Sequence, residues 1–198
     1  MPNVTRVLLA SSTVLLIGAC TSQSQPPPPP AAPTPQQVQA TRVERGGYLV
    51  NAMGCDDCHT PFKMGPNGPE PDMTRRLSGH PQDLKVDQMP KLPEPYAFAG
   101  TATSTAWAGP WGISYTANLT SDKNTGIGQE AWTEDLFVTA IREGKHMGTS
   151  RPILPPMPWP AFKNLNDEDL KSIFAYLRTV PAVNNHVPDP IIADPPKK

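Results

Sequence analysis

The sequence predicts an all-α domain with long irregular connections and extended tails. Three segments repeat apolar residues at the three- and four-residue spacing of an amphipathic helix. Elsewhere the chain is rich in residues that interrupt regular structure, since its 198 residues include 27 prolines and 14 glycines. We therefore expect one modest domain whose helices are joined by ordered loops.

The first helix is expected from about Val43 to Cys58. Its apolar residues share one face at helical spacing, and they are Tyr48, Leu49, Ala52 and Met53. Gly46 and Gly47 weaken this helix by about 1 kcal/mol each. Such a cost indicates that another backbone or a bulky ring approaches closely at these two glycines.

The second and third helices have clear ends. The second is predicted from Thr133 to Glu143, because acidic residues occupy its first turn and Gly144 follows its last residue. The third begins after Asn166, a preferred N-cap residue, and Pro181 stops it. Its predicted buried stripe contains Leu170, Ile173, Phe174 and Leu177.

The first 19 residues are typical of an export signal. Arg6 precedes the apolar run "VLLASSTVLLI", which is too short to span a bilayer comfortably as a helix. The run ends in "IGAC", which resembles the cleavage site of bacterial lipoproteins and would place a lipid on Cys20. By that resemblance, Thr21 favours the outer over the inner membrane. The alternative is an ordinary signal peptide that ends near a cysteine.

Both flanks of the expected domain are rich in proline. Residues 20–41 contain "QPPPPPAAPTP", which predicts a stiff, extended tether, and residues 184–198 predict an extended C-terminal tail. The formal net charge is -1, which gives no electrostatic reason to expect binding to nucleic acid.

The motif "CDDCH" carries the chemistry. It places Cys55, Cys58 and His59 in the spacing that attaches c-type haem, in which the two thiols bind the porphyrin and the adjoining histidine binds the iron. Zinc would need about four protein ligands, and no second cysteine pair is present. A redox-active dithiol would need a surrounding βαβ pattern, which this sequence lacks. The motif therefore predicts one covalent haem c.

Met157 is the predicted second ligand of the iron. It lies in "RPILPPMPWPAF", where prolines on both sides fix the backbone and remove N–H donors. The alternatives are Met147, a histidine, or an open position. Of the histidines, His80 and His186 are expected in solvent, and His146 at the end of the second helix.

These segments together resemble bacterial monohaem c-type cytochromes. The matching stretches are "RGGYLVNAMGCDDCHTP", "NLTSDKNTGIGQEAWTEDLFVTAIREGKHMG", "RPILPPMPWPAF" and "LNDEDLKSIFAYLRTVPAV", within residues 42–183. They are especially similar to cytochrome modules of periplasmic dehydrogenase complexes. The resemblance implies a small helical cytochrome c fold around one haem, with Tyr176 packing on Gly46 or Gly47 where the terminal helices cross. It also implies thioethers at Cys55 and Cys58, with His59 and Met157 on the iron.

The chain departs from the minimal cytochrome fold between its two iron ligands. Residues 63–117 form a long insertion rich in proline, glycine and aromatic side chains. We expect the aromatic residues to cover an edge of the haem, and the alternative is a docking surface for a partner. Asn118 and Thr120, in "NLT", are expected to form a turn that could reach a haem propionate.

With both axial positions filled, the site can transfer electrons only through the haem edge. We therefore expect an electron carrier, not an enzyme, on the periplasmic side of the cell envelope. Its expected partners are a dehydrogenase, an oxidase or another cytochrome, together with a membrane reached by the lipid on Cys20. The alternatives are a haem enzyme or gas sensor with an open distal position, and a structural lipoprotein without haem.

Overall fold

A computed structural model of the chain describes residues 32–193. The predicted signal peptide, Cys20 and most of the predicted tether lie outside these residues. The elements below all belong to the unit that begins at Pro33. None of the helices described is long and apolar enough to cross a membrane.

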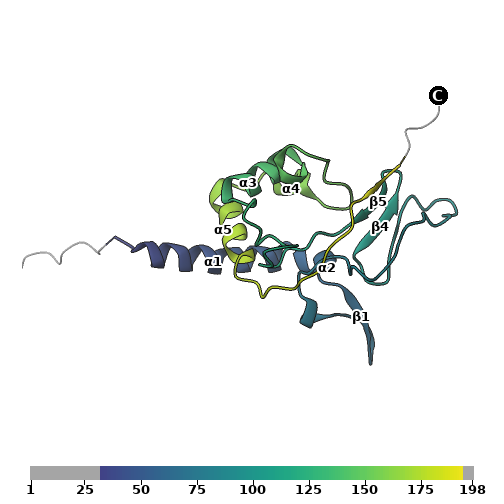
Figure 1. Ribbon diagram of the computed structural model, residues 1–198, viewed down its shortest axis with the longest axis horizontal. Coiled ribbons are helices and arrows are strands. Elements are labelled where there is room, and N and C mark those ends of the chain that lie inside the picture. Colours follow the sequence, from purple (N-terminus) through teal and green to yellow (C-terminus); the bar gives the residue numbers. More distant parts are fainter. Residues whose placement is uncertain (1–31, 194–198) are drawn as a thin grey trace, which may run out of the picture. The chain divides into compact units, whose positions relative to one another are not determined.

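The fold is mixed, and the prediction of an all-α fold is wrong. In residues 32–193 five α-helices accompany six short strands in two antiparallel sheets (Figure 1). The helices are α1 (Pro35–Ala52), α2 (Cys55–His59), α3 (Glu134–Glu143), α4 (Trp159–Phe162) and α5 (Asp167–Leu177). The strands are β1 (Phe62–Gly65), β2 (Gly68–Pro71), β3 (Ala99–Gly100), β4 (Ala106–Gly109), β5 (Gly112–Tyr115) and β6 (Ile191–Ile192). Two 3₁₀ turns, Met73–Arg75 and His146–Gly148, complete the elements.

Two tight turns account for most of the unexpected sheet structure. Strands β1 and β2 pair with Gly65 opposite Gly68, and β4 and β5 pair with Gly109 opposite Gly112. Each turn therefore has a two-residue loop, whose first residue is proline. Gly68 and Gly112 have φ of 121° and 107°, which suits glycine after a sharp reversal. Pro66 and Pro110, which were expected to interrupt regular structure, thus lie in the turns that pair the strands.

Helix α1 is longer and more interrupted than predicted. It begins at Pro35, within the predicted tether, because Thr34 and Gln37 form a reciprocal capping box ahead of it. It ends at Ala52, and Gly54, at φ 67°, turns the chain into α2. Its buried face is formed by Gly46, Leu49 and Val50, whereas Tyr48, which was expected to share an apolar face with Leu49, is 62% exposed.

Helices α3 and α5 begin and end where the sequence predicts. Thr133 caps α3 by accepting a hydrogen bond from the Leu136 amide, and Gly144 ends it at φ 63°. Asn166 caps α5 by accepting from the Asp169 amide. The core lies between these helices and α1, and its buried apolar residues are Leu49, Val50, Leu77, Ile127, Phe137, Ile141, Leu170, Ile173, Phe174, Leu177 and Val180.

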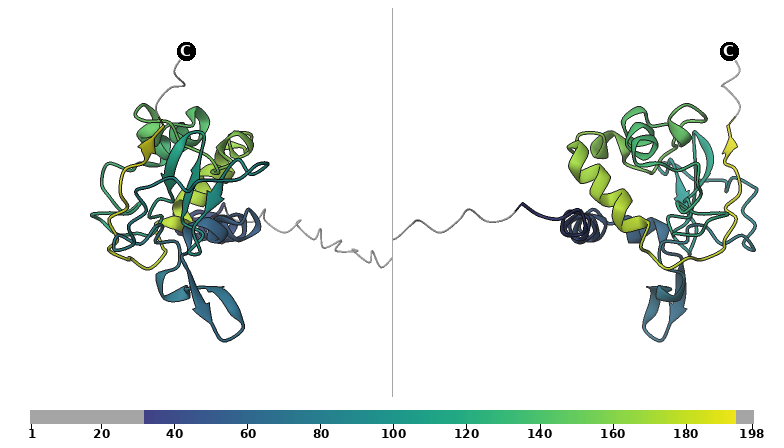
Figure 2. Two further views of the ribbon diagram at one scale, coloured as in Figure 1. Left: turned by 90° about the vertical axis from the view of Figure 1, so that its right-hand side faces the viewer. Right: turned by 60° about the vertical axis from the view of Figure 1, so that its left-hand side comes forward.

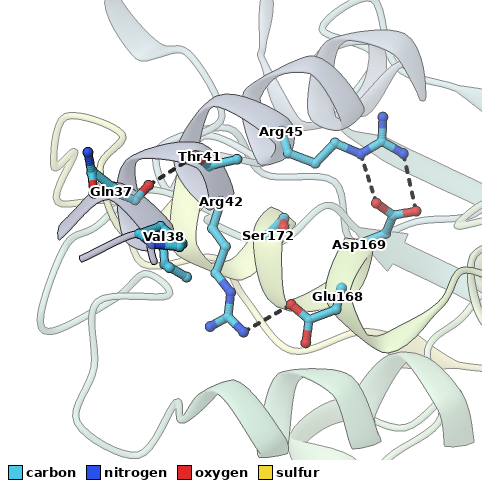
Figure 3. A pocket seen from close by; sticks show the side chains of 9 residues that line it. Gln37, Val38, Thr41, Arg42, Arg45, Glu168, Asp169 and Ser172 are labelled. Atoms are coloured by element: carbon cyan, nitrogen blue, oxygen red, sulfur yellow. Dashed lines mark hydrogen bonds and ion pairs between the residues drawn. The ribbon is translucent and has the colours of Figure 1, made fainter. Parts of the chain in front are cut away.

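Figure 2 shows helix α5 crossing helix α1. They meet at the two glycines, as the resemblance implied. A Cβ atom on Gly46 would overlap the Ser172 carbonyl, and one on Gly47 would lie 3.0 Å from the Tyr176 ring. Arg42 and Arg45 of α1 pair with Glu168 at 3.0 Å and Asp169 at 2.8 Å (Figure 3). These ion pairs border a groove of about 340 Å³ between the two helices, away from the CDDCH motif.

The C-terminal segment is part of the fold. Strand β6 pairs with β5, so the second sheet has the order β3-β4-β5-β6. Asn185 is buried in the middle of the segment that leads to β6, although the sequence predicted an extended tail there. Figure 1 shows this segment running from the end of α5 to the edge of the sheet.

Candidate haem-binding site

Helix α2 holds the whole CDDCH motif in one short helix. Cys55 and Cys58 stand about one turn apart on it, so their side chains share a face. Both thiols are free and partly buried. Burial, followed by the charge of Asp56, raises the pKa of the Cys55 thiol to about 11, and burial also raises the pKa of Cys58. Both cysteines are therefore protonated thiols at neutral pH, the form whose S–H can add across a vinyl group.

His59 is held as a neutral imidazole. Its side chain is buried, and Nδ1 lies 2.8 Å from the Ala117 carbonyl oxygen. The carbonyl can only accept, so Nδ1 carries the proton and Nε2 keeps its lone pair. Burial lowers the pKa of the imidazole, which favours this neutral form. Nε2 has no hydrogen-bond partner among residues 32–193, so it remains available to a metal.

Arg76 fixes helix α2 against its neighbours and was not singled out in the sequence. Its guanidinium donates to Asp56 Oδ2 at 2.6 Å, to Asn51 Oδ1 at 2.9 Å and to the Tyr176 hydroxyl at 2.6 Å. Asp56 also accepts from Thr60 Oγ1 at 2.8 Å. One side chain thus joins α2 to α1 and α5. No pattern in the sequence indicates this role, since Arg76 lies in a segment without periodicity.

Met157 lies in a loop that is anchored on both sides. The Ile153 amide donates to the Gly144 carbonyl at 2.8 Å, and Ser114 Oγ donates to the Pro155 carbonyl at 2.6 Å. After Met157, the Trp159 ring packs on Gly144, where no Cβ could be accommodated. The Met157 side chain is partly buried and packs against the hydrophobic core, as do Cys55 and Leu119.

Strand β5 and the residues that follow it make hydrogen bonds near both predicted axial ligands, one to the Met157 loop and one to His59. Ser114 contacts the Met157 loop, and Ala117, three residues later, contacts His59. Three extended residues span about 10 Å. The structure thus attaches both predicted ligands to neighbouring points of one backbone segment.

The other candidate ligands have different surroundings. His80 is buried rather than solvated, with Nδ1 3.0 Å from Thr105 Oγ1 and Nε2 2.9 Å from the Leu84 carbonyl, so both nitrogens are occupied. The His186 side chain is exposed, as predicted, and His146 follows α3 and packs edge-on against Trp132. Met147 is partly buried with φ of 52° in the turn after α3.

The side chain of Asn118 makes its hydrogen bonds to other residues of the chain. Its Nδ2 donates to Thr125 Oγ1 and to the Val183 and Asn185 carbonyls, and its Oδ1 accepts from the amide and hydroxyl of Thr120. The predicted turn at "NLT" is therefore present. Its side chains hold the C-terminal segment, which leaves no donor of Asn118 for a propionate.

The insertion contains two buried indole N–H donors, those of Trp107 and Trp111. Trp107 Nε1 and Trp111 Nε1 are buried, and neither has an acceptor among residues 32–193. Both rings pack against Phe98, with centroid distances of 6.5 and 6.2 Å. Buried donors in proteins nearly always have a partner. The free thiols of Cys55 and Cys58 and the neutral His59 fit the attachment of a haem, and the two indole N–H groups are further donors in the insertion.

Comparison with known proteins finds relatives that are named as cytochrome subunits. The chain is 31% identical over 147 residues, 74% of its length, to the fructose dehydrogenase cytochrome subunit of Gluconobacter japonicus. It is 30% identical over 140 residues to the gluconate 2-dehydrogenase cytochrome c subunit of Pantoea cypripedii. This chain is a homologue of dehydrogenase cytochrome c subunits.

The relationship to these cytochrome c subunits covers only part of each relative. The matched region is 23% of both proteins, so the chain spans about a quarter of their length. A further match, 27% identical over 158 residues, covers 25% of the cytochrome c subunit of the quinone alcohol dehydrogenase of Gluconobacter oxydans. No protein-family model matches the chain. The relatives are named as cytochrome subunits, which supports the predictions of an electron carrier and of haem c.

Proposed function

We propose that this chain carries one haem c, bound through Cys55 and Cys58, with His59 and Met157 as the axial ligands of the iron. The observation that carries the proposal is the state of His59. It follows two free thiols directly, it is buried and neutral, and its Nδ1 proton is committed to the Ala117 carbonyl. The haem supplies a one-electron Fe(III)/Fe(II) couple, and the protein tunes it through the ligands and their hydrogen bonds.

Each residue has a separate part in this proposal. The thiols of Cys55 and Cys58 fix the cofactor, His59 donates Nε2 to the iron, and Met157 donates its thioether sulfur. A single CxxCH motif in the printed sequence supports one haem per chain. Filled axial positions leave no place for a substrate, so the protein's function is outer-sphere electron transfer.

The test is spectroscopy of the full chain, produced with a cytochrome c maturation system. We expect a covalent haem by pyridine haemochrome assay, one iron per chain, and spectra of histidine–methionine coordination in both redox states. His59→Ala should impair haem attachment itself. A colourless protein would contradict the proposal, and rapid binding of carbon monoxide near neutral pH would instead favour a haem enzyme or gas sensor.

We further propose that the partner is a dehydrogenase, because the relatives are named as cytochrome subunits of dehydrogenases. Whole cells with and without the chain should then differ in electron flow from a sugar, alcohol or other dehydrogenase substrate to the respiratory chain. Equal rates for every substrate tested would contradict a dehydrogenase partner. They would leave the haem assignment unaffected.

The proposed location is the periplasmic side of the cell envelope, where a lipid on Cys20 anchors the protein in the outer rather than the inner membrane. The "IGAC" sequence supports this location. Mass spectrometry of the mature protein should show cleavage before Cys20 and the added lipid mass. Cys20→Ala should release haem-containing protein from the membrane fraction, and retention of the variant in that fraction would contradict the anchor.

A further inference from the structure

Asn185 is a fully enclosed polar residue outside every motif. Its side chain is 1% exposed, and it lies in residues 183–185, which we call the strap. Its Nδ2 group donates to the Ser78 carbonyl at 2.7 Å and to the His80 carbonyl at 2.9 Å. Its Oδ1 accepts from the Gln82 amide at 2.9 Å. The side chain thereby fixes the turn formed by residues 78–82.

That turn is hydrogen-bonded to the two backbone segments that the His59–Ala117 hydrogen bond joins. The Gly79 amide donates to the His59 carbonyl at 2.8 Å, and the His80 amide donates to the Thr116 carbonyl at 2.9 Å. Gly79 has φ of 75°, and a Cβ on it would collide with the Thr116 and Ala117 backbone. Residues 79 and 80 are therefore held between His59 and the segment that carries Ala117.

The strap holds the same segment from its other end. Asn118 Nδ2 donates to the Val183 carbonyl at 2.9 Å and to the Asn185 carbonyl at 3.3 Å. In return, the Val183 amide donates to Thr120 Oγ1 at 3.2 Å. Ala117, whose carbonyl accepts from His59 Nδ1, lies between residue 116, held by the turn, and residue 118, held by the strap.

We propose that Asn185 is a positioning residue for the axial ligand: it sets the strength of the hydrogen bond from His59 Nδ1 to the Ala117 carbonyl, and through it the reduction potential of the haem. The inference rests on the proposed function, in which His59 binds the iron. A hydrogen bond at Nδ1 makes the ligand more basic. A more basic ligand favours Fe(III), so loosening this bond raises the potential.

The experiment is a redox titration of matured, full-length variants. Asn185→Leu is similar in size but has no hydrogen bonds to offer, and Asn185→Ala also removes volume. Both should raise the potential, with a change in the reduction equilibrium constant of up to about tenfold, or about 59 mV for a one-electron couple. Asn118→Ala releases the strap from the other side and should shift the potential in the same direction, which keeps the test decisive if Asn185→Leu does not fold.

The matched control is Asn166→Ala, a second asparagine whose loss weakens the fold at a distance from His59. It removes the N-cap of α5, where Asn166 Oδ1 accepts from the Asp169 amide at 2.7 Å. This variant should lower the unfolding temperature while it keeps the wild-type potential.

Two results would overturn the inference. One is a wild-type potential in both Asn185 variants, and the other is an equal shift in Asn166→Ala at the same loss of unfolding temperature. Either would leave the proposed function intact, as long as the wild-type protein shows covalent haem with histidine–methionine coordination. If the wild-type protein lacks that coordination, the proposed function itself fails.

Discussion

At the scale of single residues, burial and hydrogen bonding fix the protonation states of Cys55, Cys58 and His59 in the candidate site. His59 is kept neutral by burial, and its one proton is held by the Ala117 carbonyl. The thiols of Cys55 and Cys58 stay protonated because burial raises their pKa values. A second buried histidine has another role: His80 is buried as well, but both of its ring nitrogens are hydrogen-bonded to protein atoms.

Replacing Met157 should open the iron without releasing the haem. In Met157→Ala the thioethers and His59 remain, so the haem should stay attached while the potential falls, because a methionine ligand raises it. We expect a fall of about 59 mV or more, a tenfold change in the reduction equilibrium, together with new binding of carbon monoxide. Redox titration and optical spectra measure both. Met64→Ala is the control, since Met64 is 77% exposed, and an unchanged potential in Met157→Ala would disprove the assignment.

His80 should make the fold sensitive to mild acid. Burial lowers its pKa, and the hydrogen bond to the Leu84 carbonyl offsets this only in part. The unfolded chain therefore binds a proton more readily, so stability is lost as the pH falls below about 6.5, the ordinary histidine value. Urea unfolding at pH 7 and pH 5 should show a smaller loss for His80→Gln than for the wild-type protein. Equal losses would mean that other groups cause the pH dependence.

At the scale of elements, two kinds of glycine position shape the chain. The sequences "GPNG" and "GPWG" each reverse the chain in a two-residue loop and create a hairpin within the segment predicted to be irregular. Gly46 and Gly47 instead let α1 approach α5. The repeated GPxG pattern was the available signal for strands, and it was missed because proline was interpreted only as a breaker of helices and sheets.

The crossing of α1 and α5 should not tolerate a methyl group at Gly46. Its Cβ would lie 2.7 Å from Tyr176 Cβ and would overlap the Ser172 carbonyl. Alanine gains about 1 kcal/mol of helix propensity, but overpacking of this kind typically costs about 1–3 kcal/mol. Because the neighbouring carbonyl is backbone and cannot turn away, we expect a net loss of stability in Gly46→Ala by denaturant unfolding. Glu44→Ala, at an exposed position of the same helix, should change stability by less than about 0.5 kcal/mol, and a neutral Gly46→Ala would contradict the packing described.

At the scale of the whole molecule, the proposed haem and the C-terminal segment would both hold distant parts of the chain together. Apolar side chains that face the core only in part, among them Met53, Cys55, Leu119, Trp132 and Met157, come from four different regions of the chain. A porphyrin among them would bury apolar area that the protein alone leaves open. The strap joins Asn118, which precedes Leu119, to the turn formed by residues 78–82.

Loss of the haem should therefore lower the stability of the entire fold. In a double variant, Cys55→Ser with Cys58→Ser, we expect a lower unfolding temperature by circular dichroism, by about 2–4 °C for each kcal/mol lost in a chain of this size. Wild-type protein produced without the maturation system has the native cysteines but no attached haem. It should unfold at the same low temperature. An unfolding temperature equal to that of the matured wild-type protein would show that the haem does not support the fold.

The sequence by itself determined the local features of this protein. Helices α3 and α5 follow from a cap, a periodic face and a stop signal, all within a dozen residues, and the CDDCH motif needs only five. These features depend on neighbouring residues, so a pattern along the chain is sufficient to predict them.

Only the tertiary structure decided how distant segments support His59. Residues 59, 79, 117, 118 and 185 meet through hydrogen bonds in which at least one partner is a backbone group. Every residue type carries such groups, so no sequence pattern indicates those contacts. The same reason explains why the C-terminal segment, which pairs with β5 through β6, was misjudged. A hydrogen bond between backbone groups far apart in the chain leaves no mark in the identity of the side chains.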